Sequence, residues 1–203
     1  MIALIDYGVG NITAFADIFK RLSIPVFIVD QAEKMEGADH IILPGVGAFD
    51  WAMEKLNASG MRERLDHMVL VDKVPVLGIC VGMQMMAKGS DEGEMAGLGW
   101  IDAHVRRFSK DVDGVVRQLP HMGWNDVQPV ACDTLFKGLE DGEFYFLHSY
   151  YFEPESDESV LATTSYGKSF ASAVRRANVY GTQFHPEKSH NWGVELLRNF
   201  ANL

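Results

Sequence analysis

Cysteine is scarce in this sequence. Its 203 residues include only Cys80 and Cys132. Two cysteines cannot build the disulfide framework of a small secreted domain, so we expect a reduced, intracellular chain. Long apolar runs are missing too, because no stretch of about 18 apolar residues occurs and Met1 leads into an apolar segment without a basic leader. These absences predict a cytoplasmic protein with neither a membrane span nor a signal peptide.

Basic residues are outnumbered. The chain has 18 lysines and arginines against 28 aspartates and glutamates, which gives a formal net charge of −10. A nucleic-acid binder normally carries a basic stripe, and none is visible, so we expect no nucleic-acid partner. Phosphate-binding signals are weak as well. The segment Tyr7-Gly8-Val9-Gly10 lacks the third glycine of a dinucleotide fingerprint, and no Lys-Ser or Lys-Thr pair follows it. We therefore expect no cofactor.

Short apolar segments alternate with segments of helical periodicity. With 47% hydrophobic residues, the chain is long enough to bury a substantial core. This alternation predicts an α/β fold with a central, mostly parallel sheet and helices on both of its faces. The predicted strands are 2–6, 26–29, 40–43, the run that ends at Cys80, 144–147 and 179–184, and the predicted helices are 12–22, 50–57, 61–71, 81–87 and 192–200.

The pattern changes between residues 101 and 130, where short strands alternate with turn residues. The expected strands are 101–108, 115–119 and 125–128, with turns at Asp113-Gly114 and Gly123 and a loop at 121–125. A second pair, 160–165 and 170–176, flanks a turn at 166–168. Together they predict an antiparallel β extension of the main sheet. No linker, repeat or low-complexity segment is visible, so residues 1–203 are interpreted as one domain.

The segment Gly78-Ile79-Cys80-Val81-Gly82 carries the first chemical signal. An apolar run leads into Cys80 and a helix follows at once, which is the strand, turn and helix of a nucleophile elbow. The N-terminus of the following helix favours a thiolate over a thiol. A buried structural cysteine is the simpler interpretation of a lone cysteine, because free cysteine packs as a small hydrophobe. Cys132, which has no glycine elbow, is interpreted in that way.

Active sites in parallel sheets collect at the carboxyl ends of the strands. Residues 44–50 follow one such end, and their glycines allow the backbone to approach a ligand. If this strand and the strand of Cys80 are neighbours, a backbone N–H of Gly45-Val46-Gly47 and the N–H of Val81 form an oxyanion hole. A plain strand-to-helix turn explains residues 44–50 equally well.

The segment His185-Pro186-Glu187 follows the last predicted strand. On an extended segment, which the proline favours, His185 and Glu187 point to the same side. A carboxylate beside an imidazole orients the ring and stabilises the imidazolium, as the third member of a nucleophile–base–orienter triad. A structural histidine is the alternative, and a metal site with His190 is a weaker one. His148 also follows a strand, but no carboxylate lies close behind it.

Two motifs together resemble the class I (triad) glutamine amidotransferases, whose fold is flavodoxin-like. They are Gly78-Ile79-Cys80-Val81-Gly82-Met83-Gln84 and Phe184-His185-Pro186-Glu187-Lys188-Ser189. Four more blocks are similar, more narrowly, to the glutaminase subunits of imidazole glycerol phosphate synthase, an enzyme of histidine biosynthesis. These blocks are Asp6-Tyr7-Gly8-x-Gly10-Asn11, Pro44-Gly45-Val46-Gly47-Ala48-Phe49, His121-Met122-Gly123-Trp124-Asn125 and His148-Ser149-Tyr150-Tyr151. They occur in family order along nearly the whole chain, although Val81 stands where many relatives have leucine.

The resemblance implies a glutaminase that hydrolyses glutamine to glutamate and ammonia. Cys80 would form a glutamyl thioester, His185 would transfer protons, and Glu187 would orient His185. The oxyanion would be held by backbone N–H groups of Val81 and of Gly45-Val46-Gly47. By the same resemblance, the residues in contact with glutamine would be Gly47, Gln84, Ser149 and Tyr150.

The resemblance also implies a partner. A (β/α)8-barrel cyclase subunit would cover the glutaminase site in a heterodimer and use the ammonia to make imidazole glycerol phosphate and aminoimidazole carboxamide ribonucleotide. The positions expected at or near this interface are Asn11, Trp124, Tyr145 and Lys188. Two alternatives stay open: the glutaminase of another synthase, of the pyridoxal phosphate or anthranilate type, and a non-enzymatic regulator with an oxidisable cysteine, which would not need Glu187.

Overall fold

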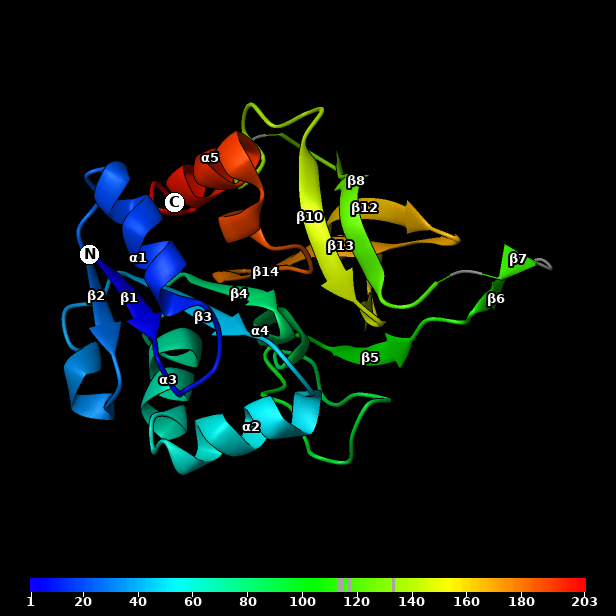
Figure 1. Cartoon of the computed structure of the whole chain (residues 1–203). Coiled ribbons are helices and arrows are strands. Elements are labelled where there is room, and N and C mark those ends of the chain that lie inside the picture. The colour runs from blue at the N-terminus through cyan, green and yellow to red at the C-terminus, as the bar shows by residue number, and fades with distance from the viewer. Residues whose placement is uncertain (113–114, 117, 133) are drawn as a thin grey trace.

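The computed structural model describes residues 1–112, 115–116, 118–132 and 134–203. Within these residues, ten strands form one sheet whose main path runs β2-β1-β3-β4-β14-β13-β11-β5, and β12 and β9 join it through β13 (Figure 1). The part of the sheet from β2 to β14 is parallel, and every pairing beyond β14 is antiparallel. This arrangement confirms the predicted parallel sheet with an antiparallel extension.

The parallel strands form the centre of the molecule. They are β1 (Ile2–Ile5), β2 (Val26–Val29), β3 (His40–Gly45), β4 (Val76–Cys80) and β14 (Val179–Thr182). Every residue of β1, β4 and β14 is buried, as expected for strands that are covered on both faces. Helices α1 (Ile12–Arg21) and α5 (His190–Phe200) cover one face, and α2 (Phe49–Ala58) and α3 (Arg62–Leu70) cover the other (Figure 1).

The antiparallel extension consists of five strands that follow residue 102 in the chain. They are β5 (Ala103–Arg107), β9 (Gln128–Pro129), β11 (Tyr150–Pro154), β12 (Val160–Tyr166) and β13 (Lys168–Arg176). The pairing of β12 with β13 confirms the predicted hairpin around Gly167. Strands β6 (Asp111–Val112) and β7 (Val115–Val116) pair with each other and project away from the body (Figure 1). The predicted turn at Asp113-Gly114 lies outside the described residues.

The prediction of a loop at residues 121–125 was wrong. These residues belong to strand β8 (His121–Asp126), which pairs with β10 (Glu143–His148) in a two-stranded ribbon beside the main sheet. Gly123, predicted as a turn, lies in the middle of β8 opposite Phe146. The sequence prediction gave too much weight to one glycine, and the structure shows buried His121 followed by exposed Met122, which is the alternation of a half-buried strand.

Short helical segments complete the chain. Helix α4 (Val81–Gln84) ends three residues before the predicted end at 87, and the 3-10 turns are η1 (Ala32–Met35), η2 (Asp157–Ser159) and η3 (Pro186–Lys188).

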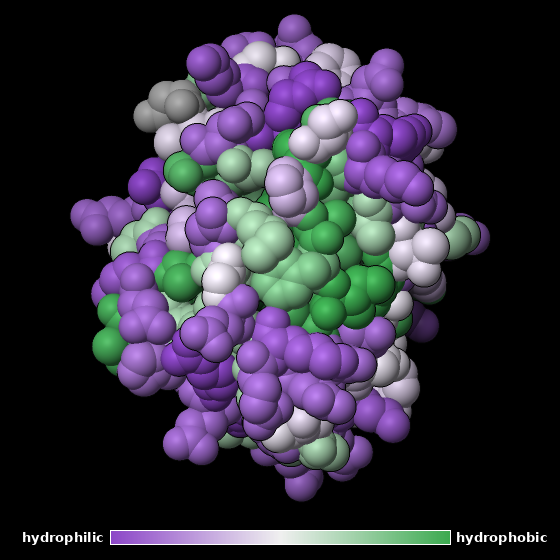
Figure 2. All heavy atoms as spheres, turned by 90° about the vertical axis from the view of Figure 1, so that its left-hand side faces the viewer, coloured by the Kyte–Doolittle hydropathy of each residue, from purple (hydrophilic) through white to green (hydrophobic). Residues whose placement is uncertain are grey.

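Across the described ranges, none of the helices has the length and apolar character needed to cross a membrane. On the side of the molecule that carries β2, an edge strand in which Ile28 is 49% exposed, apolar side chains gather within a polar surround (Figure 2).

Three glycines allow the segments around Cys80 to pack against one another. A Cβ at Gly82 would overlap the carbonyl oxygen of Leu43, and a Cβ at Gly45 would overlap the backbone nitrogen of Gly82. At Gly78, a Cβ would lie 2.7 Å from the carbonyl oxygen of Gly82. Since these obstacles are backbone atoms, they cannot move aside as a side-chain tip could. The close approach of β3, β4 and α4 therefore requires glycine at all three positions.

We expect Gly82→Ala to destabilise the fold by about 3 kcal/mol, because the added methyl group forces β3 and α4 apart. Urea unfolding of the purified chain measures this change. Gly89→Ala is the matched control, since a Cβ there would meet only the His104 ring at 3.4 Å, an ordinary contact. Equal stability of the two variants would contradict the packing requirement at Gly82.

Candidate active site

Cys80 occupies the tip of a sharp turn between β4 and α4. Its backbone has φ 55° and ψ −112°, the left-handed side of the map that side chains other than glycine rarely adopt. Strand β4 lies between β3 and β14, with Cys80 in register with Gly45. The carboxyl ends of β3, β4 and β14 therefore meet at one edge of the sheet, and the strained turn holds the sulfur there.

His185 and Glu187 meet just beyond the end of β14. Nδ1 of His185 lies 2.8 Å from Oε1 of Glu187, and both side chains are only 3% exposed. The expected extended segment is not present, because residues 186–188 form the 3-10 turn η3 with His185 at its N-cap. The turn, and not alternation along a strand, brings the carboxylate to the ring. Cys80 and His185 line the same pocket, and the Cys80 side chain contributes to the raised pKa of His185, so the three predicted residues lie together in one row.

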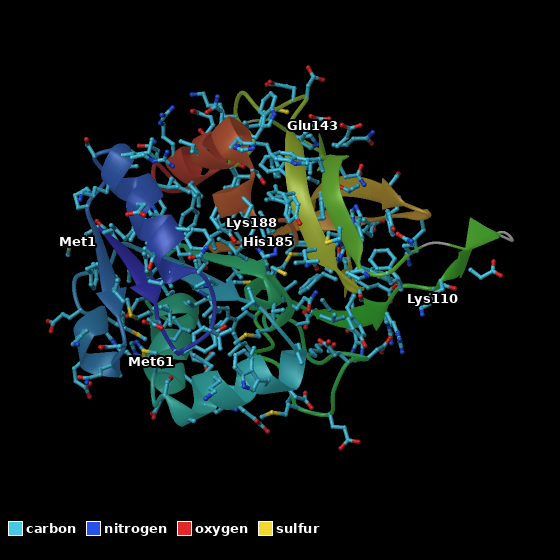
Figure 3. All side chains as sticks on the ribbon, in the orientation of Figure 1. Met1, Met61, Lys110, Glu143, His185 and Lys188 are labelled. Atoms are coloured by element: carbon cyan, nitrogen blue, oxygen red, sulfur yellow. The ribbon has the colours of Figure 1, made fainter. Side chains whose placement is uncertain are left out.

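The backbone of His185 is fixed on both sides. Its N–H donates to the carbonyl oxygen of Tyr145 at 2.9 Å, and its own carbonyl oxygen accepts from the hydroxyl of Ser189 at 2.6 Å. The Ser189 hydroxyl oxygen in turn accepts from the N–H of Tyr145 at 3.0 Å. These bonds tie η3 to β10, and Figure 3 shows His185 and Lys188 at this junction between the sheet edge and β10.

The neighbours of His185 determine its protonation. Burial alone would lower the pKa of the imidazole, but the hydrogen bonds with Cys80 and Glu187 and the negative charges of these two groups outweigh it and raise the pKa to about 10. Tyr7, buried nearby, has its pKa raised by burial and by the charge on Cys80, and its hydroxyl donates to the carbonyl oxygen of Pro44 at 2.6 Å. The site therefore stabilises an imidazolium between a sulfur and a carboxylate.

A pocket of 310 Å³ opens above the sulfur, a size suited to a small metabolite. Its lining includes all four residues predicted to contact glutamine, and also Val46 and Val81 of the predicted oxyanion hole. The lining residues are Val46, Gly47, Cys80, Val81, Gln84, Glu92, Pro120, Leu147, His148, Ser149, Tyr150, His185 and Lys188. Gly45 is not among them and lies beside Cys80 in the neighbouring strand.

Sequence reasoning missed two side chains of the site. Glu92 lines the pocket, and its carboxylate accepts a hydrogen bond from the backbone N–H of Phe49 at 2.9 Å. Gln183 is fully buried, and its Nε2 lies 3.7 Å from the sulfur of Cys80. No spacing pattern pointed to Gln183, because β14 ends at Thr182 and the contact of Gln183 with the sulfur depends on how the chain turns beyond that strand. No local pattern distinguished Glu92 from the other carboxylates of its loop.

The residues predicted at a partner interface fall into two groups. Trp124 and Tyr145 are paired across the β8–β10 ribbon with their rings 6.3 Å apart, and Nζ of Lys188 lies 5.7 Å from the centre of the Tyr145 ring. These three form one surface cluster. Asn11 instead caps helix α1, where its side chain accepts a hydrogen bond from the N–H of Ala14 at 3.4 Å.

Replacing Glu187 by Gln should lower the pKa of His185, because the charge that stabilises the imidazolium is removed. The folded pKa near 10 lies above the ordinary value of 6.5, so His185 contributes stability that is present below pH 6.5 and lost as the pH rises toward 10. NMR titration of the His185 ring should show a midpoint at least about one pH unit lower in the variant. The alkaline loss of stability should also be smaller. An unchanged midpoint would count against the pairing.

The family of the chain follows from comparisons with known proteins. The model of the class I glutamine amidotransferase family matches residues 3–202. The imidazole glycerol phosphate synthase subunit HisH of Bdellovibrio bacteriovorus is 57% identical, and that of Leptospira interrogans is 49% identical, each over the full length of both chains. A crystal structure of a glutamine amidotransferase has the same fold, with a TM-score of 0.77 at 22% identity over 100% of this chain and 99% of the other. This chain is a member of the class I glutamine amidotransferase family.

Proposed function

We propose that this chain, as one domain over residues 1–203, is the glutaminase subunit of an imidazole glycerol phosphate synthase in histidine biosynthesis. It hydrolyses glutamine to glutamate and ammonia and delivers the ammonia to a cyclase subunit. The row formed by Cys80, His185 and Glu187, of which Cys80 and His185 line the pocket, is the observation that carries the proposal. The 57% identity to a HisH subunit over the full chain supports this synthase over another amidotransferase.

The first half of the reaction forms a thioester. The proton of the Cys80 thiol passes to His185, and the sulfur attacks the carbon of the glutamine side-chain amide. Because Glu187 holds Nδ1 of the ring, we assign the proton transfer to Nε2. As the tetrahedral intermediate collapses, the C–N bond breaks and His185 returns the proton to the nitrogen, which leaves as ammonia.

Water completes the cycle. His185 takes a proton from a water molecule, the resulting hydroxide attacks the thioester carbon, and the C–S bond breaks with the release of glutamate. Glu187 keeps the ring oriented through both halves and stabilises each imidazolium that forms. In both tetrahedral intermediates we assign the oxyanion to the backbone N–H of Val81 and to one N–H of Gly45-Val46-Gly47, which border the sulfur.

The walls of the pocket fit the substrate. Glutamine carries an ammonium group, a carboxylate and a neutral amide, and the lining supplies one carboxylate, from Glu92, together with hydroxyl, amide and backbone groups of Gln84, Ser149 and Tyr150. We assign Gly47, Gln84, Ser149 and Tyr150 to substrate binding. The glycine at position 47, with φ +83°, lets the backbone come close to the ligand.

A partner must cover the pocket, because ammonia released into water at neutral pH is protonated and lost. The exposed face of the β8–β10 ribbon supports such a cover. On this face Met122 of β8 lies opposite Leu147 of β10, and Trp124 lies opposite Tyr145. Met122 is 65% exposed, Trp124 is 45% exposed and Leu147 is 37% exposed. Large apolar side chains beside a pocket mouth are typical of an interface core. We propose that this face, together with Lys188, binds a (β/α)8-barrel cyclase subunit, HisF. Asn11 would lie near the edge of that interface.

Cys80→Ser should abolish glutamate release, because an alkoxide is not accessible at the pKa of serine and no thioester can form. The assay measures glutamate from glutamine with the chain alone, and with a cyclase barrel and its nucleotide substrate. We expect wild-type activity to be highest in the complete mixture and at least about 1,000-fold lower in the variant. Wild-type turnover without any response to this cyclase, or full activity in Cys80→Ser, would refute the assignment.

Trp124→Ala should weaken binding to the cyclase barrel by about 2 kcal/mol, or roughly thirtyfold in Kd, because buried tryptophans dominate interface energies. Titration calorimetry of the two subunits measures the change. Leu70→Ala is the control: Leu70 is 46% exposed and ends α3 at the opposite edge of the sheet, so its replacement should leave the Kd unchanged. Equal effects of the two substitutions would exclude the ribbon face as the interface.

A further inference from the structure

We propose that Gln183 is a further residue of the active site, whose side-chain amide donates a hydrogen bond to the sulfur of Cys80 and holds it in the nucleophilic, deprotonated form. The inference deepens the proposed function and rests on it. Nε2 of Gln183 lies 3.7 Å from Sγ of Cys80, within the range of hydrogen bonds to sulfur. Gln183 thus reaches the reacting atom directly.

The position of Gln183 is fixed by the fold. Its side chain is fully buried, and its backbone N–H donates to the carbonyl oxygen of Ser172 at 2.9 Å. It stands between the end of β14 and His185, so one short segment delivers both groups that contact the sulfur. A buried primary amide has no water to satisfy its N–H groups, and its contacts must come from the protein. The sulfur is one of these contacts.

A chain of hydrogen bonds determines which end of the amide faces the sulfur. The carbonyl oxygen of Tyr150 can only accept, so the atom of Gln84 that lies 3.4 Å from it must be the amide nitrogen. The same nitrogen lies 3.0 Å from Oε1 of Gln183. The oxygen of Gln183 is therefore the atom that faces Gln84, and its NH₂ group is directed to Cys80.

Two buried histidines supply a second donor to the Tyr150 carbonyl oxygen. Nδ1 of His148 donates to the Tyr150 carbonyl oxygen at 2.7 Å, and Nε2 of His148 lies 2.9 Å from Nδ1 of His121. Nε2 of His121 accepts from the amide of Asn125 at 3.1 Å. Burial lowers the pKa of His148 to about 3 and that of His121 to about 4, so both rings are neutral at neutral pH. Each ring then has one N–H, and all of the donors point toward Tyr150.

The contacts of the sulfur change with its protonation. As a thiol, Cys80 donates weakly to the carbonyl oxygen of Leu147 at 4.0 Å. As a thiolate, it can only accept, and the N–H of Gln183 then becomes the favourable contact. Of the described titratable groups, His185 and Tyr7 interact with the charge of the sulfur, Glu187 pairs with His185, and Glu92, His148 and Lys188 line the same pocket. Gln183 is the neutral donor among them, and its effect does not depend on pH.

The test measures the rate at which iodoacetamide alkylates Cys80 as a function of pH, on the purified full chain. Mass spectrometry follows the peptide that contains Cys80, so the reaction of Cys132 does not interfere. In Gln183→Met, the midpoint of the rate curve should move up by about one pH unit, a tenfold change, because one hydrogen bond to a charged group is lost. In Gln183→Glu the shift should be larger, because a carboxylate then faces the sulfur.

The control is Ser172→Ala. Ser172 is as buried as Gln183, its hydroxyl has no partner among the described residues, and its backbone contact with Gln183 survives the substitution. We expect its curve to match the wild type. If Gln183→Met does not fold, the same rate curve can be measured with Gln183→Glu, because a glutamate keeps an oxygen that accepts the hydrogen bond from Gln84.

Unshifted curves in the folded Gln183 variants, or an equal shift in Ser172→Ala, would overturn the inference. Neither result depends on glutamine or on a partner. A chain that fails to hydrolyse glutamine but shows the predicted shift would contradict the proposed function and leave the contact between Gln183 and Cys80 established.

Discussion

The strained turn at Cys80 is the constraint on which the rest of the site depends. A φ of 55° at a cysteine is unfavourable, and the structure maintains it by packing β3, β4 and α4 so closely that three backbone segments touch where side chains would normally intervene. The strain has a chemical consequence. It keeps the buried sulfur at the edge of the sheet and beside the pocket, within reach of residues that follow β14 and of η3.

The polar groups around this sulfur are organised around the charge it must carry. His185 and Glu187 place an imidazolium beside it, the buried amides of Gln84 and Gln183 direct their donors toward it, and the neutral histidines donate toward the Tyr150 carbonyl oxygen. Such networks are costly when incomplete, because each buried polar atom without a partner destabilises the fold. Here they connect the catalytic row to the ribbon of β8 and β10. The same ribbon carries the apolar face assigned to the partner, so this face and the pocket are connected through β8 and β10.

Much of this could be predicted from the sequence. The elbow at Cys80, the parallel strands and the contact of His185 with Glu187 depend on local patterns, such as flanking glycines, buried apolar runs and a short motif after a strand. The exact route of the chain from His185 to Glu187 was not predictable, because a single proline is compatible with both an extended segment and a 3-10 turn. Strand β8 was missed since its stability comes from pairing with β10, some 20 residues away along the chain. Gln183 and Glu92 were missed because their roles depend on three-dimensional neighbours that no spacing reveals.

The proposed mechanism requires Cys80 to carry a covalent glutamyl intermediate within this row of side chains. That intermediate can be trapped. The chain would be mixed with glutamine, a cyclase barrel and its nucleotide substrate, quenched with acid during turnover, and examined by mass spectrometry of the intact chain and of its peptides. We expect one glutamyl group per chain, located on the peptide that contains Cys80. Turnover of glutamine without an adduct on that peptide, or with an adduct on a different residue, would contradict this mechanism.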